Sequence, residues 1–570
     1  MLLTKFKTFL YLFLLWAGIL ANNFVWLKYD NTYFTYDSHR HFLASLRIYE
    51  ILKSLNFHAI PVSINTIQLH PPFVMITTSL FYFLFGISQH ISVVANSAIF
   101  LGILIFATYG IGFKIADRKT GLLAAFIVSM YPVIFNQLKI YMLDLPLTAM
   151  VALSVYFLLC SDNFKNIKYS ILFSLSAGLG MLTKSSFLLY LIAPLSYIVI
   201  KNILIFRKEN YSLKKYIGYF VLFGTLIVLI CSLYYSTNFY KVLSKAYSGY
   251  VSTWLEVVPP SGLFLHNLRA FLWYIWGFIN WQVSFFFFVV CLIGAYFFAR
   301  TKVSNKRLFI FWIFIPWLLV SYLRHAIGFN MEITGIRYTL PILPAIALVS
   351  AIGIMKISIK NLRLFLICLI AIFGIAQLLF VSYPISVRGF TKRIFYSIKI
   401  PQKLNKYKLL PEEIILINFK DWSVSGRVSS SYPNNYQDYF TANQRIFSII
   451  NSSRGGKEAV AIFIIPDDAR LWYLQYQAYR RGKKFQFFCD WNYLRAEMGA
   501  EGNNVFDLIS SSDYVIDKDG EFLGESYMQS FVESARNNFA VLKPKFMLFW
   551  RLNWPDGSRI LIYKKKNLIF

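Results

Sequence analysis

Long apolar segments recur through the first two thirds of this 570-residue chain, and they restrict its fold more than any other feature. One α-helix needs about 20 mostly apolar residues to cross a bilayer. Eleven segments meet this requirement approximately, near residues 8–27, 91–113, 121–139, 145–160, 170–184, 186–203, 216–235, 279–299, 308–323, 338–355 and 364–383. Charged residues make up 15% of the chain, against roughly 25% in a soluble protein. The sequence therefore predicts a polytopic α-helical membrane protein of about eleven transmembrane helices.

The connections between the predicted spans carry an uneven charge. Lys and Arg gather in every second connection, for example in "FKIADRKTG" and "RTKVSNKR", on the side of Lys5 and Lys7. Cytoplasmic loops are rich in Lys and Arg, so we expect a multi-pass protein of the plasma (inner) membrane with a cytoplasmic N-terminus. The same short clusters account for the net charge of +30, and we expect membrane lipids rather than nucleic acid as partners.

Residues 71–87 are apolar but are not counted as a span. A further crossing would reverse the charge pattern of everything that follows. We expect instead an interfacial helix in the first outer loop, beginning after Pro71 and Pro72, since proline suits the start of a helix.

The chain changes character from about residue 401. Charged residues and turn signals increase, and strand-like runs appear in "EAVAIFIIP", "KKFQFF", "DYVIDKDG" and "SRILIYKKK". The predicted domains are therefore a transmembrane domain, residues 1–383, and a C-terminal extracytoplasmic α/β domain, residues 384–570.

Ionisable residues mark the predicted outer side of the membrane. Six of the nine acidic residues within 1–383 and all seven histidines fall there. Ionisable groups near membrane depth are costly and tend to be functional. An interfacial preference of histidine accounts for part of this pattern, but less easily for the charged cluster around Asp37 and Arg40. We therefore expect the chemistry at the outer face.

Two acidic residues are candidates for that chemistry. Asp37 precedes an amphipathic helix predicted over residues 38–54, and Asp144 lies at the outer mouth of the fourth span. The structural alternatives are a surface helix anchored by basic groups and a helix N-cap. Two carboxylates on one face suit binding of a shared substrate or metal ion.

Cationic residues occur at the outer ends of other spans. Lys184 lies at the end of the fifth span, where a snorkelling lysine is the alternative, and Arg337 and Tyr338 lie at the start of the tenth. Arginine favours bidentate contact with phosphate. With Arg40 and His70 these residues suit the binding of a lipid phosphate at the outer leaflet.

Five motifs occur in a fixed order in the chain. They are the Asp37–x–x–Arg40 pair and "HPPF", "LDLPLT", "GLGMLTKS" and "RYTLPILPA". Over about residues 1–383 the chain resembles the glycosyltransferase C superfamily, specifically its protein O-mannosyltransferase and lipid A aminoarabinose transferase group. The resemblance implies an enzyme that transfers a sugar, with inversion, from a polyprenyl-phosphate donor to an acceptor outside the cytoplasm. Protein hydroxyls, glycolipids and cell-wall glycan all remain open as acceptors.

The resemblance also assigns roles. Asp37 matches the catalytic acid of the first loop, and Asp144 matches the acid of the second outer loop. The residues that match or support a donor-phosphate site are Arg40, His70, Lys184, Arg337 and Tyr338.

The chain departs from the group at two positions. Ser38 stands where many relatives have a second acid, which weakens a metal site there, so we expect no metal ion and no other cofactor. His70 stands where relatives have a lysine or a histidine, and unlike a lysine it titrates near neutral pH. Because histidine loses its charge above about pH 6.5, we expect donor binding to weaken as the pH rises.

Two other function classes fit part of the sequence. A transporter or flippase for an anionic lipid-linked glycan uses similar cations, but transporters often show paired repeats with broken helices, which are not evident here. The other class is a membrane-anchored binding protein whose C-terminal domain recognises the ligand.

Overall fold

The structure is a computed structural model. It describes residues 2–29, 36–55, 70–209, 213–254, 263–303, 305–324, 333–382, 395–401, 413–418, 436–453, 459–464, 485–488, 504–519, 526–553 and 558–566. The chain forms two compact units, Met1–Asn31 with Ala44–Arg427 and Thr32–Leu43 with Val428–Phe570. One boundary therefore falls inside helix α2 (Tyr36–Lys53). The other lies between Arg427 and Val428, later in the chain than the division that the sequence analysis places after residue 383.

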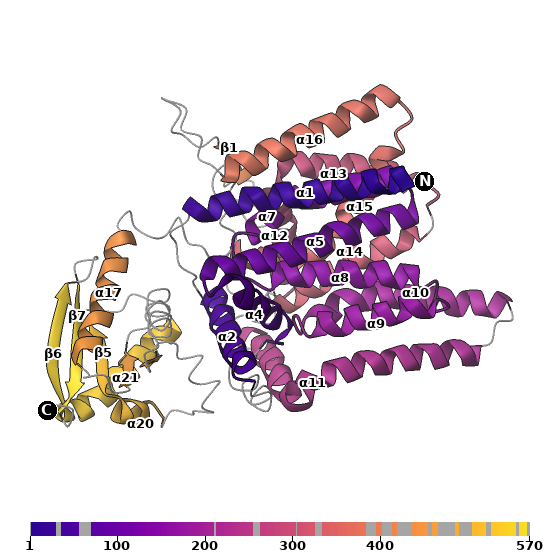
Figure 1. The fold of residues 1–570 in the computed structure, drawn as a ribbon. Helices are drawn as coiled ribbons and strands as arrows, with labels where there is room; N and C mark the ends of the chain where they lie inside the picture. Colours follow the sequence, from indigo (N-terminus) through magenta and orange to yellow (C-terminus); the bar gives the residue numbers. More distant parts are fainter. Residues whose placement is uncertain are drawn as a thin grey trace. The chain divides into compact units, whose positions relative to one another are not determined.

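The first unit is helical apart from one short pair of strands, and its long helices run roughly side by side (Figure 1). Its elements are α1 (Leu2–Tyr29), the end of α2, α4 (Phe73–Phe85), α5 (Gln89–Ile115), α6 (Arg118–Ser129), α7 (Pro132–Gln137), α8 (Asp144–Cys160), α9 (Ile167–Met181), α10 (Phe187–Glu209), α11 (Leu213–Trp254), α12 (Leu263–Gly277), η2 (Phe278–Val283), α13 (Ser284–Ala299), α14 (Lys306–Arg324), η3 (Ile333–Ile342), α15 (Leu343–Met355), α16 (Lys360–Ser382), β1 (Phe395–Lys399) and β2 (Glu413–Asn418).

Each of the eleven predicted spans contains helix, which confirms the predicted membrane fold. Among the described residues, five helices are long and apolar enough to cross a membrane: Phe6–Lys28, Gln89–Ile115, Phe271–Ala299, Ile336–Met355 and Lys360–Ser382. A bent pair within α11 is a sixth candidate, and the remaining apolar helices are shorter.

Helix α4 occupies the apolar segment that the sequence analysis did not count as a span. It begins directly after Pro72 and has 13 residues, too few to cross a bilayer. Val74 and Tyr82 lie on its buried side, whereas Leu84 and Phe85 are exposed. The predicted helix and its starting point are confirmed, and its position at the membrane surface stays a prediction.

Helices α13 and α15 approach each other at two glycines. A Cβ atom on Gly353 would lie 1.8 Å from the carbonyl oxygen of Gly294, and one on Gly294 would lie 2.4 Å from Cα of Ser350. Small residues at such crossings allow backbones to pack closely, which is how membrane helices gain much of their association energy.

We expect Gly353→Ala to destabilise the protein by about 3 kcal/mol, because the added methyl group meets backbone that cannot move aside. Thermal unfolding in detergent measures the change. Gly18→Ala is the matched control, since nothing lies within 4 Å of a Cβ at that position. Equal stability of the two variants would contradict this account of the α13–α15 contact.

The second unit is built around a five-stranded mixed sheet. Its strand order is β4 (Phe485–Phe488), β3 (Ala459–Phe463), β5 (Tyr514–Lys518), β7 (Arg559–Lys565) and β6 (Phe546–Asn553). Strands β4, β3 and β5 are parallel, and β7 pairs antiparallel with both β5 and β6. The four predicted strand-like runs coincide with β3, β4, β5 and β7, so the predicted α/β fold is confirmed.

Helices cover both faces of this sheet because successive strand residues point to opposite sides. Ala461 and Ile516 pack with Ile450 of α17 (Tyr436–Ser453). Val515 packs on the other face, in a cluster with residues of α20 (Asn504–Ser511) and α21 (Ser526–Leu542) such as Phe539. The unit is therefore a three-layer α/β/α arrangement.

Candidate active site

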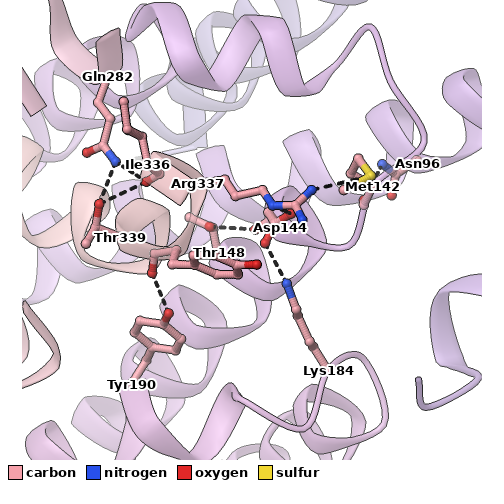
Figure 2. A network of polar contacts seen from close by, with 11 residues as sticks. Asn96, Met142, Asp144, Thr148, Lys184, Tyr190, Gln282, Ile336, Arg337 and Thr339 are labelled. Atoms are coloured by element: carbon pink, nitrogen blue, oxygen red, sulfur yellow. Dashed lines mark hydrogen bonds and ion pairs between the residues drawn. The ribbon is translucent and has the colours of Figure 1, made fainter. Parts of the chain in front are cut away.

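Asp144, the first residue of α8, lies at the centre of a group of charged side chains (Figure 2). Its Oδ1 atom accepts a hydrogen bond from Lys184 Nζ at 2.7 Å, and its Oδ2 atom lies 3.8 Å from Arg337 Nε. The ring of Tyr338 adjoins both cations, with Lys184 Nζ and Arg337 Cζ each 5.4 Å from its centroid. The structure thus brings together four of the predicted site residues, and we call these four side chains the Asp144 cluster.

The charges in the Asp144 cluster do not balance, since two cations share one carboxylate. The carboxylate is buried, with 2% of its side chain exposed, whereas 14% of Lys184 and 16% of Arg337 remain accessible. Uncompensated buried charge is unfavourable, so Asp144 is the counter-ion that allows both cations to lie so close together. Among the ion pairs described here, the cations exceed the carboxylate by one charge, which favours an incoming anion.

Asp144 does not cap its own helix. The N-cap residue of α8 is Leu143, and no side-chain capping bond forms there. Its backbone carbonyl accepts instead a bond from Thr148 Oγ1 at 2.7 Å. The acid is therefore directed to the cations, in contrast to the N-cap alternative considered from the sequence.

Arg337 and Tyr338 are carried by η3, a 3₁₀ segment that contains Pro341. Proline cannot donate a backbone hydrogen bond, and backbone at membrane depth must find its partners within the protein. Side chains of other helices supply these partners. Gln282 Nε2 donates to the carbonyl of Ile336 at 2.5 Å, and Tyr190 Oη donates to the carbonyl of Tyr338.

A third donor completes this support. Trp312 of α14 is fully buried and its Nε1 donates to the carbonyl of Pro341 at 3.2 Å. Sequence reasoning missed Tyr190, Gln282 and Trp312 as supports of the site. For Gln282 a signal was present, because a polar residue within an apolar span needs an internal partner.

The connection between α7 and α8 is held from two other helices. Asn23 of α1 donates to the carbonyl of Leu138 at 2.8 Å, and Asn96 of α5 donates to the carbonyl of Met142 at 3.1 Å. These bonds fix the segment that leads into Asp144. We refer to residues 138–144 as the Asp144 loop.

The "HPPF" and "GLGMLTKS" motifs also meet in the structure. The backbone N–H of Phe73 donates to the carbonyl of Leu182 at 3.0 Å. His70 and Lys184 therefore belong to adjoining segments, although they are far apart in the sequence.

Asp37 and Arg40 lie in the first turns of α2, as predicted. The side chain of Asp37 is outside the described residues. Arg40 belongs by its contacts to the second compact unit, whereas the Asp144 cluster belongs to the first.

The donor set of the Asp144 cluster suits an anion better than a metal ion. Divalent hard cations prefer several carboxylate or carbonyl oxygens, but here one carboxylate faces two cations. Within the described part of the chain, no three His, Cys, Asp or Glu side chains group together as metal ligands would.

Comparison with solved structures identifies the fold. The structure of ArnT from Cupriavidus metallidurans in the apo state aligns with a TM-score of 0.54 at 14% identity, covering 98% of this chain and 98% of that chain. The structure of ArnT from the same organism bound to undecaprenyl phosphate aligns with a TM-score of 0.53 at 14% identity and the same coverage. The class defined here is thus a multi-pass membrane protein of the glycosyltransferase C fold.

Comparison at the level of sequence finds one family model that matches part of the chain. A family model described as dolichyl-phosphate-mannose-protein mannosyltransferase matches residues 69–235, a range that includes His70, Asp144 and Lys184. No curated protein matches the chain. The family model over this part of the chain and the fold agree with the resemblance seen in the motifs.

Proposed function

We propose that this protein transfers a sugar from a polyprenyl-phosphate donor to an acceptor hydroxyl on the outer side of the membrane, with inversion at the sugar carbon. The observation that carries the proposal is the Asp144 cluster, in which Lys184 and Arg337 share one buried carboxylate. The fold shared with a protein solved with undecaprenyl phosphate supports the same donor class. The acceptor is a glycolipid, a glycan or a protein.

The proposed chemistry needs positive charge more than acid catalysis. The leaving group is a polyprenyl phosphate, which is a stable anion, and its charge grows as the bond to the sugar breaks. Fixed cations that meet this charge lower the barrier. We assign this role to Lys184 and Arg337, and by resemblance to Arg40, with His70 and Tyr338 as hydrogen-bond donors.

The attacking hydroxyl must lose its proton, and Asp37 is the proposed general base. The proton passes to the Asp37 carboxylate as the acceptor oxygen bonds to the sugar carbon on the face opposite the phosphate. Asp144 already binds two cations, so we assign it the positioning of Lys184 and Arg337 rather than proton transfer.

A lipid transporter or flippase is the alternative function. It would bind the same phosphate through Lys184 and Arg337 but would break no bond. A general base beside the phosphate site has no role in transport, so release of free polyprenyl phosphate separates the two functions.

The test incubates membranes that contain the protein with a polyprenyl-phosphate sugar labelled in the sugar. We expect transfer of label and release of polyprenyl phosphate, and we expect Lys184→Met to lower kcat/KM by about 10²-fold or more. Lys168→Met is the control, because this lysine lies at the opposite end of α9. Lipid movement without release of polyprenyl phosphate would favour the transporter instead.

We expect the activity to survive EDTA, because the proposed phosphate site is made of side-chain cations. Transfer rates before and after chelation, with added Mg²⁺ or Mn²⁺ as the restoring condition, measure this. Loss of activity that either ion restores would mean that a metal takes part.

A further inference from the structure

Three hydroxyl groups meet in a fully buried position beside the Asp144 loop. Tyr141 Oη donates to Thr78 Oγ1 at 2.8 Å and lies 2.7 Å from Ser45 Oγ. All three residues are 0% exposed. A hydroxyl donates once and accepts twice, so Tyr141 satisfies both neighbours when Ser45 donates to it.

These three residues come from three separate segments. Tyr141 belongs to the Asp144 loop, Ser45 to α2 and Thr78 to α4. A further bond, from Ser79 Oγ to the carbonyl of Ser45 at 2.8 Å, joins α4 to the backbone of α2. We call Tyr141, Ser45, Thr78 and Ser79 the hydroxyl junction.

The hydroxyl junction acts on the segment that leads into Asp144. Tyr141 is three residues before Asp144, and the carbonyl of Met142 between them is held by Asn96. Tyr141 is thus a side chain through which the Asp144 loop contacts α2 and α4 by hydrogen bonds.

We propose that Tyr141 is a positioning residue that fixes the Asp144 loop against α2 and α4 and so holds Asp144, with the cations it binds, in place for sugar transfer. The proposal rests on the function proposed above. Misplacement of reacting groups by about 1 Å can cost about 10²-fold in rate. Because the junction is buried, its hydroxyl groups have no water to replace a lost partner, and removal of one leaves the others unsatisfied.

The protein contains a matched internal reference for this residue. Tyr82 of α4 is also buried, and its hydroxyl lies 2.6 Å from Ser92 Oγ at the start of α5. Tyr82→Phe removes one buried hydroxyl, as Tyr141→Phe does, but this bond does not reach the Asp144 loop. A purely structural role for Tyr141 predicts similar behaviour of the two variants.

The first experiment measures steady-state transfer with a polyprenyl-phosphate sugar. We expect Tyr141→Phe to lower kcat by at least about 10-fold with KM for the donor little changed, and Tyr82→Phe to leave both near wild type. Ser45→Ala removes one of the two bonds that Tyr141→Phe removes, so it should reproduce part of the loss, and the double variant should lose no more than Tyr141→Phe alone. Equal kcat values in Tyr141→Phe and Tyr82→Phe would overturn the proposal.

The second experiment does not depend on activity. Amide hydrogen exchange over residues 44–53 reports local opening of α2. We expect exchange there to rise by roughly 10-fold in Tyr141→Phe and to stay unchanged in Tyr82→Phe. If wild type transferred no sugar but this difference appeared, the proposed function would fail while the link between Tyr141 and α2 stood. Unchanged exchange in Tyr141→Phe would overturn the link itself.

Discussion

Asp37→Asn should abolish most turnover while leaving donor binding intact. A general base contributes about 10²–10⁴-fold to the rate, and asparagine keeps the size of aspartate but cannot accept the proton. We therefore expect kcat to fall by about 10²-fold or more, with the affinity for the polyprenyl-phosphate donor close to that of wild type. Steady-state transfer and equilibrium binding of polyprenyl phosphate measure the two quantities separately.

The control for this variant is Glu50→Gln on the same helix. Glu50 is an exposed residue in the last turns of α2, so its neutralisation should leave transfer unchanged. If Asp37→Asn transferred sugar as fast as Glu50→Gln, residue 37 would not be the base, and another group would have to take the acceptor proton.

Asp144→Asn should cost both stability and activity. It leaves Lys184 and Arg337 close together without their counter-ion, and breaking a buried ion pair on one side typically costs about 3–5 kcal/mol. Because both cations are partly exposed, we expect about 3 kcal/mol, measured by unfolding in detergent. Without the carboxylate, Lys184 and Arg337 are no longer held in place and stabilise the phosphate charge less well, so kcat/KM should fall by about 10²-fold or more.

A double variant separates charge balance from function. Asp144→Asn with Lys184→Met leaves Arg337 as one positive charge, which equals the net charge of the wild-type cluster. We expect it to regain much of the lost stability but not the transfer activity, because a cation for the phosphate is missing. Asp117→Asn is the control, since this acid only caps α6. A fully stable Asp144→Asn protein would show that Asp144 is not the counter-ion.

The membrane fold was readable from the sequence because length and apolarity decide whether a segment can cross a bilayer. The prediction that α4 is not a span followed from the distribution of Lys and Arg among the connections, together with Pro71 and Pro72 at the start of the helix. The sequence did not show that α6 ends at Ser129 and that a separate short helix begins at Pro132. Apolar composition continues through this break, so composition alone gives no sign of it.

Proximity within the site was predictable only in part. Asp144 begins α8 and Lys184 follows the end of α9, and such neighbouring ends of consecutive helices meet, so their approach follows from topology. Arg337 comes from a span much later in the chain, and its place beside Asp144 depends on how helices pack rather than on their order. The resemblance to a known superfamily supplied what helix order could not.

The supports of η3 were out of reach for a different reason. Gln282, Tyr190 and Trp312 donate hydrogen bonds to backbone carbonyls. The sequence does not show which carbonyls accept hydrogen bonds from side chains rather than from the backbone. Such bonds become visible only when the backbone path is known.

The way η3 is held has a consequence for how this protein family diversifies. An ordinary α-helix is held by hydrogen bonds within its own backbone. In η3, which carries Arg337 and Tyr338, three backbone carbonyls accept hydrogen bonds from side chains of neighbouring helices, and substitution can remove these side chains. Exchanging one of these side chains can shift the two proposed donor-binding residues, Arg337 and Tyr338, while both of them are retained. Substitutions at 190, 282 and 312 are therefore the natural place to seek variants that accept a differently shaped donor.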